Sequence, residues 1–148
     1  MDWDLYFRSI AEAVKNRSKD QRTQIGAVIV GENREIVSTG YNSFPRGIND
    51  DVPERQERPE KYYWMEHAER NAIINAALIG VSTKNTTMYL TCGMPCCDCT
   101  RAIINAGIRK VYMYPGNAGG KGPHWKEMAI RSKAMFEESG VEIVYYED

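Results

Sequence analysis

All four cysteines of this 148-residue chain lie between positions 92 and 99, and this crowding is the strongest constraint on what the chain can be. A disulfide framework would spread its cysteines along the sequence, so the cluster indicates metal or redox chemistry in a reducing compartment. The chain opens on the acidic Met1-Asp2-Trp3-Asp4, without an apolar leader, and no apolar run approaches the roughly 18 residues of a membrane span. We therefore expect a cytoplasmic protein.

Length and charge narrow the class further. A chain of 148 residues has the usual size of one domain, and we expect residues 1–148 to form it. The formal net charge is −1. Proteins that hold long nucleic acids need a positive field, so this charge argues against nucleic acid as a partner. With no membrane segment either, a small-molecule ligand is the better expectation.

Apolar residues recur with helical and strand periods that alternate along the chain. A turn at 31–34 predicts a hairpin between the first two strands, whereas the polar, proline-rich segment 40–65 predicts a long functional loop. Strand–helix–strand units favour an α/β fold with helices on both faces of a mixed sheet. The predicted helices span 3–16, 67–79, 96–107 and 125–139, and the predicted strands span 25–30, 35–39, 87–91, 110–114 and 141–146.

Two short motifs each follow a loop and open a helix: His67-Ala68-Glu69, and Pro95-Cys96-Cys97-Asp98-Cys99. Cys96 and Cys99 are three residues apart and share a helix face, close enough for both to bind one ion. The partial positive charge of a helix N-terminus favours their thiolate forms. His67 as a third ligand would leave one tetrahedral position open, as a catalytic zinc requires. Cys97 lies off this face and is predicted to pack.

Glu69 has a specific task in such a site. A zinc ion with two thiolates is formally neutral and polarises water weakly, so a carboxylate beside it can take a proton and pass it on. Deamination of cytosine needs one proton at N3 and another at the leaving amine, and one glutamate can carry both. The H-x-E and P-C-x-x-C pair is the signature of zinc-dependent nucleobase deaminases.

Each motif alone permits other interpretations. A Cys-x-x-C pair can be a redox dithiol. A closed structural zinc site would need a fourth ligand and no adjacent carboxylate. The chain could therefore be a non-catalytic zinc or redox module, and Glu69 is the residue that favours catalysis.

Over nearly its whole length the chain resembles the deoxycytidylate (dCMP) deaminases of animals and bacteriophages, within the zinc-dependent cytidine deaminase superfamily. The catalytic motifs would fit any member, but the Gly40–Gly47 segment and the long insertion before His67 point to the branch that acts on nucleotides. Deaminases of dCTP, of cytosine or cytidine, and of tRNA adenosine remain alternatives. The resemblance is carried by Ser18-Lys19-Asp20, residues 23–30, 40–47, 67–73 and 88–91, the cysteine motif and Ala106-Gly107-Ile108.

This resemblance implies a three-layer αβα cytidine deaminase-like fold with a five-stranded mixed sheet and one catalytic zinc per chain. It implies hydrolysis of dCMP to dUMP and ammonia, which supplies dUMP for thymidylate synthesis, in the host cytoplasm if the gene is phage-encoded. It also implies a homohexamer, activated by dCTP and inhibited by dTTP at a magnesium-dependent site.

The same resemblance assigns residues to two nucleotide sites. Asn42 is expected at the deoxyribose, with Ala68 and Pro95 also touching substrate. Lys121, in a glycine-rich segment, is a candidate for the substrate phosphate, although an incidental surface lysine fits equally well. In the loop, Arg46 could pair with an effector phosphate, and Gly40 and Gly47 could permit close backbone approach to the nucleotide. A solvated loop without a role is the alternative. The residues expected at the effector and its magnesium are Phe44, Arg46, Gly47, Asn49, Asp50, Asp51 and Asn71.

Overall fold

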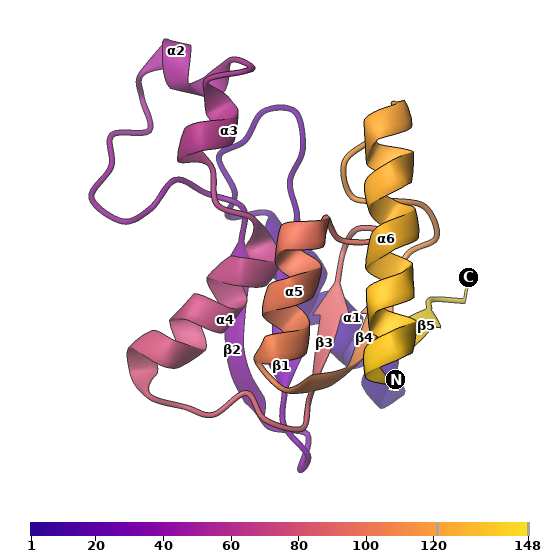
Figure 1. Ribbon diagram of the computed structural model, residues 1–148. Helices are drawn as coiled ribbons and strands as arrows, with labels where there is room; N and C mark the ends of the chain where they lie inside the picture. The colour runs from indigo at the N-terminus through magenta and orange to yellow at the C-terminus, as the bar shows by residue number, and fades with distance from the viewer. Residues whose placement is uncertain (121, 148) are drawn as a thin grey trace.

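The computed structural model describes residues 1–120 and 122–147. Within them lies a five-stranded sheet of order β2-β1-β3-β4-β5 (Figure 1). The strands are β1 (Gly26–Val30), β2 (Ile36–Tyr41), β3 (Thr86–Leu90), β4 (Ile108–Met113) and β5 (Glu142–Tyr145). The helices are α1 (Trp3–Lys15), α2 (Pro53–Gln56), α3 (Lys61–Trp64), α4 (Ala68–Ile79), α5 (Cys97–Asn105) and α6 (Pro123–Ser139).

The sheet is mixed. Strand β1 pairs antiparallel with β2 and with β3, whereas β3, β4 and β5 run parallel. The predicted hairpin is therefore confirmed, with Ala27 opposite Gly40 in its register. Parallel neighbours need a crossover, and helices α5 and α6 supply the two crossovers between β3, β4 and β5.

Strand β1 is buried on both faces, which is why its sequence is an unbroken apolar run. Ala27 and Ile29 pack into the core shared with α4, α5 and α6, whereas Val28 and Val30 pack against α1. Figure 1 shows α4, α5 and α6 on one face of the sheet and α1 on the other. The predicted α/β architecture, with helices on both faces of a five-stranded mixed sheet, is confirmed.

Gly40 allows helix α4 to lie directly on strand β2. A Cβ atom at this position would come within 2.3 Å of the Ala72 backbone nitrogen and 2.5 Å of the Ala68 carbonyl oxygen. The sequence suggested that Gly40 makes room for a nucleotide, and this was wrong, because the helix backbone occupies that room. Gly47 does adopt a left-handed conformation, with φ of 82° and open space around it.

The segment predicted as one long loop, 40–65, contains two short helices. Strand β2 continues to Tyr41, and α2 and α3 follow within residues 43–66, which we call the insertion segment. Helices of four residues are too short to show a period in the sequence, which explains the difference. Backbone hydrogen bonds between Ser43 and Glu66, at 2.8 and 3.1 Å, close its base. It stands at the end of the sheet where α4 and α5 begin (Figure 1).

Among the described residues, no helix combines the length and the apolar character that are needed to cross a membrane.

Candidate metal centre

Two helix starts bring three metal-binding side chains together. His67 is the N-cap residue of α4, and Cys96 is the N-cap residue of α5. Cys99 follows in the first turn of α5, where its backbone N–H donates to the Cys96 sulfur at 3.4 Å. The ligand atoms of the three residues all lie within 4.8 Å of one another, and no other such group of His, Cys, Asp or Glu occurs among the described residues.

The geometry fits zinc. His67 Nδ1 lies 3.3 Å from Cys99 Sγ and 3.5 Å from Cys96 Sγ. Zinc binds imidazole nitrogen at about 2.0–2.1 Å and thiolate sulfur at about 2.3 Å in a tetrahedron, so ligand atoms of one site must lie within a few ångströms of each other. One histidine and two cysteines leave the fourth position of such a tetrahedron for a non-protein ligand.

The two thiols are prepared for metal binding. The pKa of Cys96 is lowered to about 4, chiefly by the hydrogen bond from the Cys99 thiol, with His67 and the Cys99 backbone N–H adding to the effect. The same contact, together with burial, raises the pKa of Cys99. A cation bound by both sulfur atoms would displace the proton of the hydrogen bond between them, because metal ligands must be deprotonated.

Glu69 lies in the first turn of α4, two residues after His67, and is only 1% exposed. Its Oε1 has no hydrogen-bond partner within the described part of the chain, which is rare for a buried oxygen and marks a place for a water or substrate atom. Burial raises the pKa of its carboxyl group, although the neighbouring His67 charge works in the opposite direction. A carboxyl group with a raised pKa can both accept and return a proton near neutral pH.

A cavity opens beside His67, Glu69 and Cys96, and we call it the metal-site cavity. Asn42, the residue expected at the sugar, is part of its wall. Several wall residues were not expected from the sequence, because they lie outside the two motifs. They come from the segment between α1 and β1, from the insertion segment, and from the start of α6 and the loop before it. They are Asp20, Thr23, Ile25, Arg58, Lys61, Tyr62, Met65, Ala118, Gly119 and Trp125.

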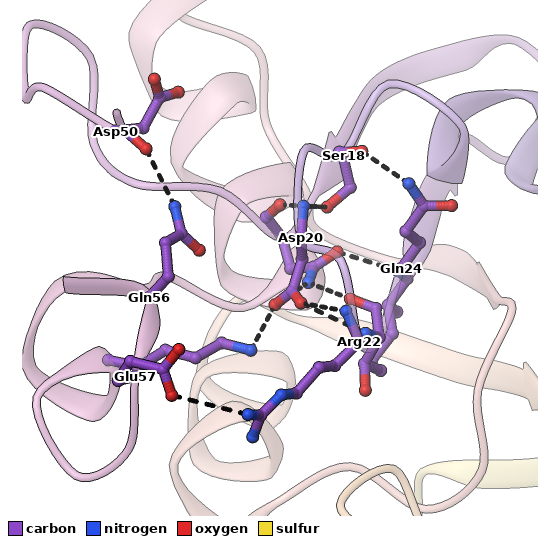
Figure 2. A network of polar contacts seen from close by, with 11 residues as sticks. Ser18, Asp20, Arg22, Gln24, Asp50, Gln56 and Glu57 are labelled. Carbon is purple, nitrogen blue, oxygen red and sulfur yellow. Dashed lines mark hydrogen bonds and ion pairs between the residues drawn. The ribbon is translucent and has the colours of Figure 1, made fainter. Parts of the chain in front are cut away.

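Asn42 is 6% exposed, and its side-chain amide is held from three directions. Its Oδ1 accepts from the Ile25 backbone N–H at 2.8 Å, while its Nδ2 donates to the Thr23 carbonyl at 2.7 Å and to Asp20 Oδ2 at 3.4 Å. Asp20 in turn forms an ion pair with Lys61 at 2.6 Å. Figure 2 shows this network around Asp20, between the loop after α1 and the insertion segment.

Two other residues predicted to touch substrate, Ala68 and Pro95, are next to cavity residues in the chain. Ala68 is fully buried at the start of α4, and neither it nor Pro95 lines the metal-site cavity. The Pro95 carbonyl accepts from the Ser132 hydroxyl of α6 at 2.8 Å. Lys121, the candidate for the phosphate, lies outside the described residues.

A second cavity of about 370 Å³, which we call the loop cavity, lies between the insertion segment, α4 and the loop after α1. Of the residues predicted at the effector site, Phe44, Arg46, Gly47, Asp50 and Asn71 line it, whereas Asn49 and Asp51 do not. The cavity is bordered by charges of both signs, because Arg17, Lys19 and Arg46 are accompanied by Asp20, Asp50 and Glu66.

Contacts in the loop cavity hold several of these side chains in place. Arg46 Nη2 donates to Asn75 Oδ1 at 2.6 Å, and Lys19 pairs with Asp50 at 3.3 Å. The Asn71 amide donates to the Tyr41 carbonyl at 2.8 Å. Asp50 is thus neutralised by a lysine in this structure, and the magnesium predicted at Asp50 and Asp51 stays a prediction.

Cys97 faces helix α6, away from the ligand group. Its thiol donates to the Met128 carbonyl at 3.5 Å, and the Ser132 hydroxyl approaches its sulfur at 3.8 Å. Cys92 lies after β3, where burial raises the pKa of its thiol well above the usual value. The placement of Cys97 agrees with the packing role predicted for it.

Comparisons with known proteins agree with this geometry. The family model described as the cytidine and deoxycytidylate deaminase zinc-binding region matches residues 1–115. Deoxycytidylate deaminase of Homo sapiens is 35% identical over 146 residues, which cover 95% of this chain and 78% of the human protein. An uncharacterized deaminase from the luxG 3' region of Aliivibrio fischeri is 38% identical over 143 residues, covering 97% of this chain and 92% of that protein.

Solved structures show the same fold. The dCMP deaminase of cyanophage S-TIM5, in complex with dCMP and dUMP, superposes with a TM-score of 0.76 at 24% sequence identity. The match covers 96% of this chain and 95% of the phage chain.

Proposed function

Since the chain belongs to the family of zinc-binding cytidine and deoxycytidylate deaminases, we propose that it hydrolyses dCMP to dUMP and ammonia. The observation that carries the proposal is the Glu69 carboxyl group, buried beside His67, Cys96 and Cys99 with one oxygen unpartnered. A structural zinc site or a redox dithiol has no use for such a group. A hydrolytic site needs it.

His67, Cys96 and Cys99 would hold the zinc ion, which when bound acts as a Lewis acid that activates water for attack on C4 of the cytosine. Glu69 would take a proton from the attacking water and deliver it to N3. It would then take the second proton from the new hydroxyl group on C4 and deliver it to the departing amine, which leaves as ammonia. Its raised pKa suits both directions of transfer. The same enclosure by α4, α5 and the cavity wall that buries Glu69 would keep bulk water from competing for these protons.

The nucleotide phosphate needs a cation, and we propose Arg58. Lys61, the other cation of the metal-site cavity, is already neutralised by Asp20 at 2.6 Å. Among the described residues, Arg58 has no carboxylate partner, and its guanidinium lies 5.8 Å from the Tyr62 ring centroid. An exposed, unpaired guanidinium at the mouth of the cavity can bind a phosphate through charge-assisted hydrogen bonds. This arrangement favours a nucleotide over a free base or nucleoside.

The loop cavity supports regulation as part of the proposal. We propose that dCTP activates and dTTP inhibits the enzyme there with Mg²⁺, through Arg46 and the neighbouring polar groups. We also propose a homohexamer, on the family resemblance alone. All four cysteines are free thiols, which suits the reducing cytoplasm.

Release of ammonia from dCMP, dCTP, deoxycytidine and cytosine, each with and without dCTP and dTTP as effectors, tests the proposal. We expect dCMP to have the highest kcat/KM, dTTP to inhibit and dCTP to relieve inhibition. Preference for dCTP or for cytosine would identify a different deaminase of the family. Absence of turnover with every substrate by the zinc-loaded protein would reject catalysis.

A further inference from the structure

We propose that Lys61 is a positioning residue, which anchors the insertion segment to Asp20 and through Asp20 fixes Asn42 in the wall of the metal-site cavity. The inference rests on the proposed function, because it concerns how that cavity recognises its substrate. It starts from an ion pair that the sequence motifs do not contain.

The Lys61–Asp20 pair is buried. Lys61 Nζ lies 2.6 Å from Asp20 Oδ2, and the two side chains are only 10% and 3% exposed. Lysine is almost never buried without a partner, and removing one member of a buried pair leaves the other charge uncompensated. Lys61 is the buried residue of α3, so this contact is the point at which the short helix is attached to the rest of the molecule.

Asp20 connects α3 to two other parts of the chain through its hydrogen bonds. Its Oδ1 accepts from the backbone N–H groups of Arg22 and Thr23, at 2.9 and 3.2 Å. Its Oδ2 accepts from both Lys61 and the Asn42 amide. One carboxylate therefore joins the insertion segment, the loop after α1 and the end of β2 (Figure 2).

Asn42 depends on this arrangement. Two of its three amide contacts, those to Asp20 and Thr23, are made to a loop whose turn Asp20 itself holds. Without Lys61, Asp20 would be a buried unpaired carboxylate and would turn toward solvent or take a proton. Either change would weaken the hydrogen bonds that orient Asn42, the cavity residue that we expect to contact the sugar.

Asp20, Asn42 and Met65 each line both the metal-site cavity and the loop cavity. The anchored network is thus the wall between the two cavities. A loss of Lys61 should therefore affect how the sugar is recognised more than it affects proton transfer at C4.

The test compares Lys61→Met, Asp20→Asn and Lys61→Arg with wild type on dCMP, deoxycytidine and CMP, measuring kcat and KM for each and the thermal unfolding midpoint. Arg55→Met is the matched control, because Arg55 is a cation of the same segment that lines neither cavity. We expect Lys61→Met and Asp20→Asn each to lower kcat/KM about tenfold on dCMP and on deoxycytidine alike. The preference for dCMP over CMP should narrow, and Lys61→Arg should restore it.

Two outcomes would overturn the inference. If Lys61→Met impairs dCMP but leaves deoxycytidine unchanged, while Asp20→Asn has no such effect, Lys61 binds the phosphate directly. If unfolding midpoints fall but the ratio of dCMP to CMP stays at the wild-type value, the pair is only structural. Both outcomes require wild type to deaminate dCMP, so an inactive wild type would reject the proposed function instead.

Discussion

His67 Nδ1 lies 3.3 Å from Cys99 Sγ, although 32 residues separate them in the chain. The contact exists because α4 and α5 both begin at the same end of the sheet, with β3 between them in sequence (Figure 1). Glu69 is placed by the same helix start, so the ligands and the proton carrier are positioned by two helix N-termini. The predictions below follow from this arrangement and from the cavities around it.

Glu69→Gln should keep zinc and fold but lose turnover. The glutamine amide can still form hydrogen bonds where the Glu69 carboxylate lies, but it cannot accept and return a proton. We therefore expect kcat to fall by a factor of at least about 10²–10⁴. Ammonia release measured beside zinc content and unfolding midpoint checks this. Substantial residual activity in the zinc-loaded variant would reject the role of Glu69.

Replacing His67, Cys96 or Cys99 should remove zinc and destabilise the protein, because the ion would join two helix starts. Cys97→Ser should keep zinc, since the Cys97 thiol faces α6. Elemental analysis after gel filtration gives the metal content. Zinc lost from the Cys97 variant and kept in the Cys99 variant would show that the ligand set is wrong.

Arg58→Gln should raise the KM for dCMP about tenfold to hundredfold, because hydrogen bonds to a charged group contribute about 1.5–3 kcal/mol. Deoxycytidine, which has no phosphate, should be affected little. Arg55→Gln, a cation of the same segment outside the metal-site cavity, is the control. Equal losses on both substrates would show that Arg58 does not recognise the phosphate.

Arg46→Ala should lose the response to effectors while basal turnover of dCMP is retained. Arg46 lines the loop cavity and has no place in the metal-site cavity, so its loss removes a phosphate contact without touching the chemistry. The effector concentration needed should rise about tenfold to hundredfold. Titration of dTTP against dCMP turnover decides this, and identical curves for variant and wild type would exclude Arg46 from the site.

The stability contributed by Asp20 should decrease in acid. Burial alone would raise the pKa of this carboxyl group, but hydrogen bonds from Lys61 and from the Arg22 and Thr23 backbones outweigh it and lower the pKa. A pKa lower in the folded than in the unfolded state, where it is near 3.9, gives stability that is present above that value. That stability is lost as pH falls through the folded pKa.

Urea unfolding of wild type and Asp20→Asn between pH 7 and pH 2.5 measures this effect. At pH 7 the variant should be less stable by about 3–5 kcal/mol, the usual effect of breaking a buried ion pair. The difference should shrink below about pH 4 as the wild-type carboxylate is protonated. A difference that stays constant with pH would mean that Asp20 is not charged in the folded protein.

The local elements of this protein could be predicted from its sequence. The β1–β2 hairpin, the start of α4 at His67 and the start of α5 at Cys96 follow from turn residues, apolar periods and N-cap positions, all of which are interactions between near neighbours. The spacing of Cys96 and Cys99 predicted a shared face for the same reason. The residues of the candidate metal centre could therefore be predicted without knowledge of any tertiary contact.

Only the tertiary structure decided what surrounds that centre. Arg58 and Lys61 come from a segment that the sequence predicts to be a polar loop. Nothing in the local sequence shows that Lys61 is buried against Asp20, 41 positions earlier, or that Arg58 has no carboxylate partner among the described residues. The sequence predicted that Gly40 leaves space for a ligand, but the backbone of α4 fills that space. The free energy of a charge depends on the groups that surround it in space. Those groups come from segments that are distant in sequence, and packing across the whole sheet decides which of these segments meet.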